Sequence, residues 1–138
     1  MKKVLIDTDV ILDFFFDRQP FAVDSAQVLS LCEKKEIDGF VTSIMLSNIY
    51  YLFRKTDKHE KVIESLKMLM KILDVATTNK QTILNALESD FKDFEDALQN
   101  FTAQNNEEIE IIITRNVKDY KTSKLVVMTP ETYLKSIP

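Results

Sequence analysis

The sequence predicts an α/β protein built around a mostly parallel sheet with helices on both faces. Short aliphatic runs alternate along the chain with longer amphipathic stretches, which is the pattern of strands connected by helices. The chain has 138 residues, enough for one domain, 1–138, with its own core. A single glycine and three prolines leave no linker in which a domain boundary would fall, so the elements must follow one another closely.

The N-terminal half predicts two strands that each lead into a helix. Residues 3–6 form an aliphatic run that stops at Asp7, as a buried parallel strand does. Residues 40–41 are a second short run, and Thr42-Ser43 after them can cap the next helix. From the spacing of their apolar residues, the helices expected in this half cover 10–16, 22–35, 45–52 and 58–73.

The C-terminal half continues the alternation. Residues 110–113, Glu-Ile-Ile-Ile, are the clearest strand of the chain because they are almost entirely β-branched. Thr129-Pro130 opens a final helix, since proline fits the first helical turn. The remaining expected elements are strands over 74–77 and 125–128, a helix from Thr78 or Asn79 to Leu87, and a helix from Phe94 to between Gln104 and Asn106.

Composition and charge exclude several classes of protein. Lys and Arg total 18 against 22 Asp and Glu, a net charge of −4, so any contact with nucleic acid must be local. Cys32 is the only cysteine, which excludes an internal disulfide and a cysteine-rich metal site, and its apolar neighbours predict a core position. Asp7 and Asp9 interrupt the first apolar run too early for a secretory signal, and no stretch resembles a membrane span. The cytoplasm is therefore the expected location.

Acidic side chains are expected to gather at one edge of the sheet. Asp7 ends the first strand and residues 114–116 follow the strand at 110–113, and the carboxyl ends of parallel strands face the same edge. Asp93 and Asp96 are three residues apart at the start of a helix and therefore share a face. Carboxylates gathered in this way repel one another unless a cation lies between them, and oxygen ligands suit Mg²⁺ or Mn²⁺. For Asp7 taken alone, a role as turn former or helix cap is an equal alternative.

Three segments together resemble the PIN domain family, which includes the VapC-like ribonuclease toxins of bacterial toxin–antitoxin pairs. They are Leu5-Ile6-Asp7-Thr8-Asp9-Val10, Asp93-Phe94-Glu95-Asp96-Ala97 and Ile113-Thr114-Arg115-Asn116-Val117-Lys118-Asp119-Tyr120. Each is weak alone, but their order and spacing fit the family over nearly the whole chain. The resemblance implies a three-layer α/β/α PIN-like fold and a Mg²⁺- or Mn²⁺-dependent endonuclease activity on single-stranded RNA. It also implies a homodimer and, for a toxin, a cognate antitoxin protein.

The resemblance further implies a set of metal ligands. Asp7 matches the family's first acid and Asp96 its third, while Asn116 or Asp119 stands where the last one or two fall.

One position departs from the family. Its second acid, a glutamate on the helix after the second strand, aligns with Asn48. An asparagine can coordinate through its carbonyl oxygen but carries no charge, so it would hold the metal more weakly unless Asp93 supplied the missing carboxylate.

The expected chemistry is metal-assisted hydrolysis of a phosphodiester, which requires no protein nucleophile. Asp96 or Asp119 would accept the proton of the attacking water, and the residues do not decide between them. The Thr114 hydroxyl would contact the metal-bound water or the phosphate, with a plain strand-ending role as the alternative. Asp9 is expected to cap the helix that follows it, with metal binding as the alternative.

Other polar and aromatic residues receive more general expectations. Phe14, Phe15 and Phe16 are expected in the core, with a dimer face or base stacking as the alternative. His59, the only histidine, is expected outside catalysis. The candidate contacts to RNA phosphates are the basic residues Arg18, Arg54, Lys55, Lys58, Arg115 and Lys118.

Two other functions stay open at this point. Asp7-Thr8-Asp9 after an apolar strand also resembles the Asp-x-Asp motif of haloacid-dehalogenase-like phosphatases, although the usual continuation after Asp9 is missing. Asn48 in place of an acid would fit a catalytically impaired PIN-like module that binds RNA or a protein. With one histidine, one cysteine and no glycine-rich loop, nucleophilic triads and Walker-type phosphate loops have no support.

Overall fold

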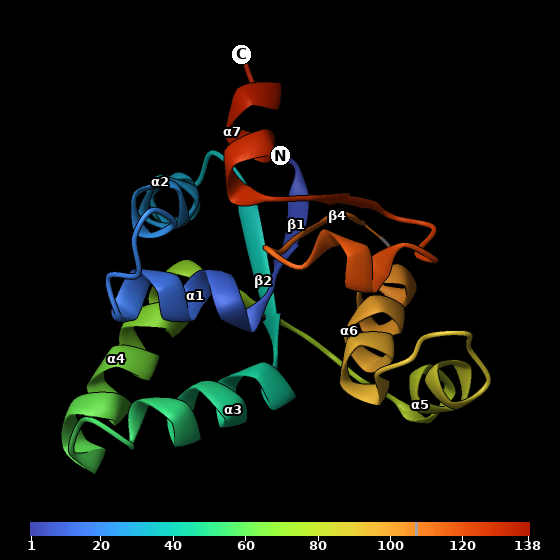
Figure 1. The fold of residues 1–138 in the computed structure, drawn as a ribbon, viewed down its shortest axis with the longest axis horizontal. Coiled ribbons are helices and arrows are strands. Elements are labelled where there is room, and N and C mark those ends of the chain that lie inside the picture. The colour runs from blue at the N-terminus through green and yellow to red at the C-terminus, as the bar shows by residue number, and fades with distance from the viewer. Residues whose placement is uncertain (107) are drawn as a thin grey trace.

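A five-stranded parallel sheet forms the centre of the computed structural model, which describes residues 1–106 and 108–138 (Figure 1). The strand order is β3-β2-β1-β4-β5, and every neighbouring pair is parallel. The predicted α/β class and parallel sheet are therefore confirmed. The strands are β1 (Lys3–Ile6), β2 (Asp38–Thr42), β3 (Asp74–Ala76), β4 (Ile109–Ile113) and β5 (Val126–Met128).

Helices cover both faces of this sheet. Figure 1 shows α1 to α4 gathered on one side of the strands and α5 and α6 on the other, with α7 packed against α2 near the chain ends. The helices are α1 (Thr8–Phe15), α2 (Ala22–Glu33), α3 (Ser43–Phe53), α4 (His59–Ile72), α5 (Lys80–Leu87), α6 (Phe94–Asn105) and α7 (Pro130–Ser136). Each corresponds to a predicted helix. The 3-10 helix η1 (Val117–Tyr120) was not predicted, because four residues are too few to show a periodic pattern.

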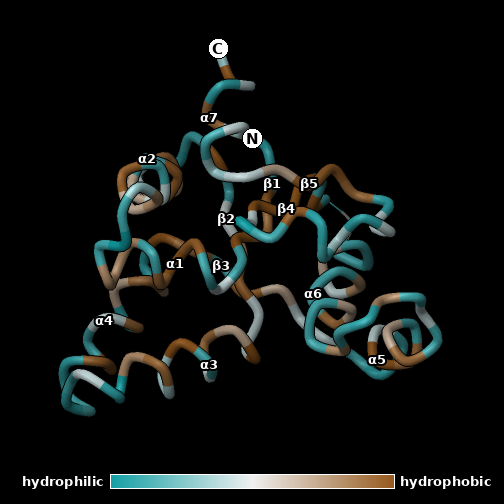
Figure 2. The backbone as a smooth tube through the Cα atoms, viewed as in Figure 1, coloured by the Kyte–Doolittle hydropathy of each residue, from teal (hydrophilic) through white to brown (hydrophobic). Residues whose placement is uncertain are grey.

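The core lies where β1 and β4 pass through the middle of the sheet. Val4, Leu5 and Ile6 are completely buried, as are Ile112 and Ile113 on the neighbouring strand. Figure 2 shows hydrophobic residues along these central strands and hydrophilic ones along the outer loops. Each such side chain contributes about 1.5–3 kcal/mol when it leaves water.

Two predictions about core residues are confirmed. Cys32 is buried in the main hydrophobic cluster, and Phe14, Phe15 and Phe16 pack against that cluster. The ring centroid of Phe53 lies 5.2 Å from that of Phe15 and 5.4 Å from that of Phe16, so these rings join α1 to α3. None of the helices in the described part of the chain combines the length and apolar character that crossing a membrane requires.

The strand register places the segments after β1 and β4 side by side. Ile6 pairs with Ile113, and the next amide along, that of Asp7, donates to the Ile113 carbonyl oxygen at 2.9 Å. The Thr114 amide in turn donates to the Met128 carbonyl oxygen of β5 at 2.9 Å. Asp7 and Thr114 therefore leave adjacent strands at the same edge of the sheet, as the sequence predicts.

Gly39 on β2 offers a test of how tightly this core is packed. A methyl group at this position would lie 2.6 Å from Cys32 Sγ and 2.8 Å from Leu73 Cδ2, so Gly39→Ala overpacks the space between β2 and its helices. We expect Gly39→Ala to lower the free energy of unfolding by about 1–3 kcal/mol, measured by urea denaturation. Cys32→Ala removes the nearest atom, so the double variant should lose less than the two single changes added together. Strict additivity would contradict this account.

Candidate active site

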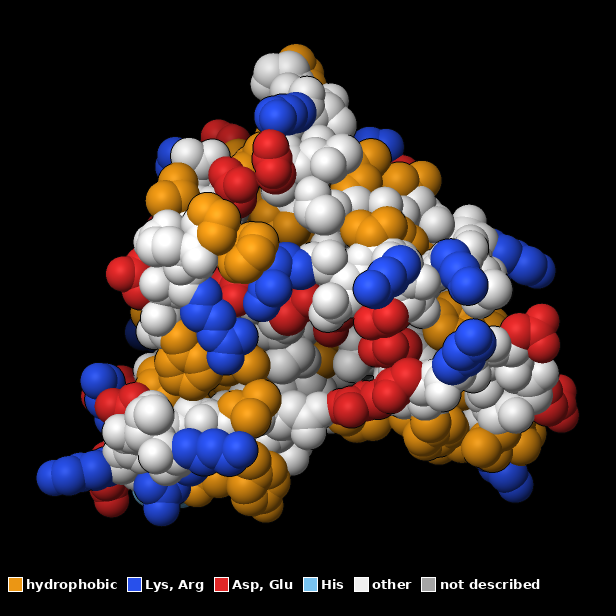
Figure 3. Space-filling model, in the orientation of Figure 1, with side chains coloured by type: hydrophobic (Ala, Val, Ile, Leu, Met, Phe, Trp, Pro, Cys, Tyr) orange, Lys and Arg blue, Asp and Glu red, His pale blue; other side chains and the backbone are white. Residues whose placement is uncertain are grey.

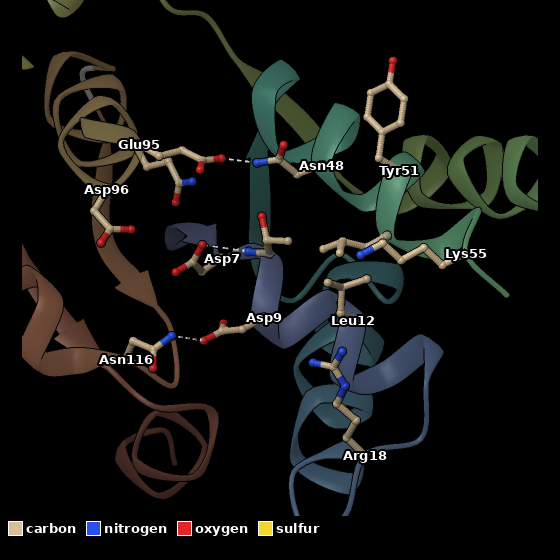
Figure 4. Close-up of a pocket in the computed structure, with 13 residues that line it drawn as sticks. Asp7, Asp9, Leu12, Arg18, Asn48, Tyr51, Lys55, Glu95, Asp96 and Asn116 are labelled. Carbon is tan, nitrogen blue, oxygen red and sulfur yellow. Dashed lines mark hydrogen bonds between the residues drawn. The ribbon is translucent and has the colours of Figure 1, made fainter. Parts of the chain in front are cut away.

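A cavity of about 600 Å³ opens at the carboxyl edge of the sheet, between α1, α3 and α6. Figure 4 shows side chains from these helices directed into the same space. Of the predicted metal ligands, Asp7, Asn48, Asp96 and Asn116 line this cavity. The other lining residues are Thr8, Asp9, Leu12, Arg18, Tyr51, Leu52, Lys55, Glu95 and Gln99.

Asp7 is the most constrained of these residues. It is 8% exposed, and its Oδ1 accepts a hydrogen bond from the Thr8 amide at 2.8 Å, which makes Asp7 the N-cap of α1. Its Oδ2 accepts from the Thr114 hydroxyl at 2.8 Å and lies 3.3 Å from the Tyr120 hydroxyl. Burial raises the pKa of Asp7, and the nearby charge of Asp96 raises it further, although these hydrogen bonds act in the opposite direction.

Asp9 does not cap the helix, and that prediction is wrong because Asp7 already occupies the capping position. The Asp9 side chain turns instead toward the segment after β4. Its Oδ2 accepts from the Arg115 amide at 3.1 Å and from Asn116 Nδ2 at 3.0 Å (Figure 4). Its Oδ1 is buried without a hydrogen-bond partner in the described residues, and burial followed by the charge of Asp7 raises the pKa of Asp9 to about 6.

Asp93 and Asp96 have different positions at the start of α6. Asp93 is the exposed N-cap, and its Oδ1 accepts from the Asp96 amide at 2.9 Å. Asp96 is partly buried inside the cavity, and burial together with the charges of Asp93, Asp119 and Glu95 raises its pKa to about 6. Asp93 thus caps the helix and does not line the cavity around Asp7, so of the two only Asp96 reaches it.

Asp119 lies on the other side of Asp96. It belongs to η1 and lines a second, smaller cavity with Asp93 and Lys118, and Asp96 lines both cavities. Thr114 lines neither cavity: it is fully buried and its hydroxyl donates to Asp7. Asp96 therefore lies between Asp7 in the first cavity and Asp93 and Asp119 in the second. Thr114 holds Asp7 through a buried hydrogen bond.

Sequence reasoning missed three residues at this site. Glu95 lines the cavity and accepts a hydrogen bond from Asn48 Nδ2 (Figure 4). The buried Tyr120 hydroxyl lies 2.9 Å from Gln99 Oε1 in addition to its contact with Asp7. Glu95 and Tyr120 both belong to the segments that carry the family resemblance. Their place in these segments could have indicated that they belong to the site, but the sequence does not show which residues they contact.

The predicted phosphate contacts separate into two groups. Arg18 and Lys55 line the cavity, and Lys118 lines the second one. Arg54 donates to the Asp57 carbonyl oxygen at 2.9 Å, and Lys58 is the residue before α4, so neither lines the cavity around Asp7. His59 also lies away from it, with Nδ1 2.9 Å from the Tyr50 hydroxyl.

Arg115 is held by the protein instead of facing the cavity. Its Nε lies 2.6 Å from Asp13 Oδ2 and its NH2 nitrogen 3.0 Å from Asp13 Oδ1, a bidentate pair with a fully buried carboxylate. Its guanidinium also stacks on Phe21, 4.1 Å from the ring centroid. This side chain neutralises Asp13 and joins the segment after β4 to α1, so a structural role replaces the phosphate contact predicted for it.

The donor set suits a hard divalent cation. Within residues 1–106 and 108–138, no three Asp, Glu, His or Cys side chains are arranged as a ready metal cage, and no Lys or Arg forms an ion pair with Asp7, Asp96 or Glu95. Mg²⁺ takes one or two carboxylates and completes its shell with water, so it needs no such cage. Asp7 and Asp96 are the carboxylates that would hold the ion, because both line the cavity and neither has a Lys or Arg partner among the described residues.

Comparison with known proteins identifies the family. The family model described as "PIN domain" matches residues 3–118. The chain belongs to the PIN domain family. This assignment confirms the resemblance in the sequence and removes the dehalogenase-like phosphatase as an alternative.

One relative and several solved structures align with this chain over nearly its whole length. Ribonuclease VapC1 of Aquifex aeolicus (strain VF5) is 28% identical over 137 residues, which cover 96% of this chain and 93% of the relative. The solved structure of VapBC2 from Rickettsia felis, bound to a DNA fragment from their promoter, has a TM-score of 0.68 at 16% identity and covers 91% of this chain and 96% of that one. VapBC-1 from nontypeable Haemophilus influenzae has a TM-score of 0.68 at 14% identity, covering 94% and 98%. At these identities the solved structures establish the fold.

The crowded carboxylates of this PIN domain predict a pH-dependent stability. The pKa values of Asp9 and Asp96 are raised from 3.8 to about 6, so the folded chain binds these protons more tightly than the unfolded chain. Their stabilising contribution is complete below about pH 4 and is lost as the pH rises through about 6. We expect the metal-free protein to melt at a higher temperature at about pH 5 than at about pH 7.5. Asp96→Asn should reduce this difference and Glu64→Gln, an exposed site on α4, should not; an unchanged pH profile for Asp96→Asn would contradict the assignment.

The ion pair of Arg115 with Asp13 predicts a loss of stability when it is broken. Arg115→Met leaves the Asp13 carboxylate buried beside Arg18 alone, whose NH1 nitrogen is 3.6 Å away. We expect the free energy of unfolding to fall by about 3–5 kcal/mol in urea denaturation, and Arg18→Met, at a more exposed side chain, to cost less. If Arg115→Met left the stability unchanged and weakened RNA binding, the original prediction that Arg115 contacts an RNA phosphate would be supported instead.

Proposed function

We propose that this PIN domain protein is a metal-dependent endoribonuclease that hydrolyses phosphodiester bonds of single-stranded RNA. The observation that carries the proposal is the buried Asp7 carboxylate, fixed by three donors in a cavity that Asp96 enters from α6. The relative named Ribonuclease VapC1, aligned over 96% of the chain, supports the same activity.

The residues around the cavity have separate tasks in this mechanism. A bound Mg²⁺ or Mn²⁺ ion supplies an acidified water and offsets negative charge on the phosphate. Asp7 and Asp96 would hold that ion, with Asn116 as a neutral oxygen donor beside them. Thr114 and Tyr120 keep Asp7 in one orientation, because both hydroxyl groups lie within hydrogen-bond distance of Oδ2.

A carboxylate beside the water would accept its proton. Asp96 and Asp119 are the two candidates, because Asp96 lines both cavities and Asp119 lines the second one beside it. If Asp96 holds the ion, Asp119 is the remaining carboxylate for this task.

Single-stranded RNA suits the surface around the cavity. Figure 3 shows acidic side chains gathered at the centre of this face with lysine and arginine side chains around them. Arg18 and Lys55 line the cavity and would contact phosphates, and Tyr51 beside them is 67% exposed and offers a ring on which a base can stack. This local arrangement attracts RNA although the chain carries a net charge of −4.

We further propose that the protein is the toxin of a toxin–antitoxin pair in the cytoplasm and forms a homodimer. The structural neighbours named VapBC support a protein partner. Exposed apolar side chains support it as well, since they offer surface that association would bury. They include Ile83, Leu84 and Leu87 on α5 and Phe94 at the start of α6.

Replacement of Asp7 tests the ribonuclease. Asn is as good an N-cap as Asp, so Asp7→Asn keeps the helix cap while it removes the charge and the acceptor that Oδ2 offers to Thr114. We expect at least a roughly 100-fold loss of cleavage of single-stranded RNA in Mn²⁺, because an oxygen ligand loses its charge. Gel electrophoresis of a labelled RNA measures this, with Glu64→Gln as the control. Equal cleavage by Asp7→Asn and the parent would refute the proposal, and RNA binding without any cleavage by the parent would favour the impaired binding module.

A further inference from the structure

The side of the cavity formed by α3 carries an amide where a carboxylate is expected. Asn48 lines the cavity from α3, opposite the acidic side chains of α6, and it carries no charge. Its Nδ2 donates to Glu95 Oε1, so the amide is held in one orientation with its nitrogen toward α6. An asparagine used in this way is a donor to a carboxylate and offers the cavity only its carbonyl oxygen.

Glu95 brings a charge to this same place from the other side. It lies in the first turn of α6, and its side chain extends across the space above Asp7 to reach Asn48 (Figure 4). In the described chain it forms no ion pair with Lys or Arg. Glu95 and Asp96 both lie in the first turn of α6, and both line the cavity. The Glu95 carboxylate is therefore directed into the cavity and lacks a positive partner there.

The hydrogen bond leaves most of the Glu95 carboxylate available. A carboxylate offers two oxygens and about four acceptor positions, and the Asn48 amide uses one of them. A glutamate at position 48 would face Glu95 with a second negative charge and lose this bond, whereas the amide fixes Glu95 in place. The neutral residue on α3 and the acidic residue on α6 thus complement each other.

We propose that Glu95 supplies a further carboxylate of the divalent metal site, beside Asp7 and Asp96 and in place of the family's second acid, and that Asn48 is the positioning residue that holds it there. In the family resemblance, this carboxylate belongs to the helix after β2. Here it belongs to the first turn of α6, and both positions line the same cavity. The inference rests on the proposed function, because it assigns a ligand to the cation of that site.

Titration calorimetry of the metal-free protein with Mn²⁺ tests this assignment separately from activity. Glu95→Gln should weaken Mn²⁺ binding by about 10- to 100-fold, and Asn48→Ala by about 10-fold at most, since it removes only the orienting bond. Exchanging the two groups, Asn48→Glu with Glu95→Gln, keeps both the net charge and the amide–carboxylate pair. It should bring the affinity back to within about fivefold of the parent, because the charge then enters the same space from α3.

Two controls separate the possible outcomes. Glu64→Gln removes a remote exposed charge and should leave the affinity unchanged. Asp7→Asn should abolish binding. Unchanged Mn²⁺ affinity in Glu95→Gln while Asp7→Asn abolishes it would overturn this inference and leave the proposed nuclease intact. A parent protein that takes up no Mn²⁺ would overturn both.

A purely structural link between α3 and α6 predicts a different result. In that case Glu95→Gln would lower the melting temperature in the presence of a chelator and leave the Mn²⁺ affinity unchanged, and the exchanged double variant would gain nothing over Glu95→Gln. Either finding would overturn the assignment. The expected result is the reverse: little change in the melting temperature without metal, and a smaller rise on adding Mn²⁺ than the parent shows.

Discussion

The fixed position of the Asp7 carboxylate at the end of the central strand is the constraint on which the site depends. Its two oxygens meet the Thr8 amide, the Thr114 hydroxyl and the Tyr120 hydroxyl, which come from α1, from the end of β4 and from η1. These contacts connect segments more than 100 residues apart in the chain, and they exist because β1 and β4 are neighbours in the sheet. An oxygen ligand held in this way costs little further ordering when it meets a cation.

Burial and mutual repulsion give this edge of the sheet its chemistry. Asp7, Asp9 and Asp96 all have raised pKa values, with burial as the largest cause in each case. Burying these neighbouring carboxylates in their charged form lowers the stability of the fold, and it occurs where helices from both faces of the sheet converge. A cation bound there, as proposed, would remove this electrostatic cost and would couple metal binding to stability. The Asn48 amide limits the cost as well, because it avoids one more negative charge and orients Glu95.

The positive side chains divide according to what they neutralise. Arg115 serves the buried Asp13 and is not free to follow a substrate, whereas Arg18 and Lys55 reach the cavity. The net charge of −4 is therefore no argument against the proposed RNA substrate, since the charges that would contact it are few and local. The separation also explains why proximity in sequence was a poor guide to the residues that line the cavity: Arg115 follows Thr114 directly, yet its partner lies on α1.

The sequence by itself determined the order and type of the elements, the PIN domain family and the place of Asp7, because aliphatic runs, capping residues and strand ends are local signals. It also showed that position 48 lacks a charge. Only the tertiary structure decided the partner of each polar group. It made Asp7 the cap in place of Asp9, paired Arg115 with Asp13, and set Glu95 against Asn48, 47 residues away. Such contacts depend on how distant helices pack, and two side chains that meet across a cavity leave no periodic trace in the chain.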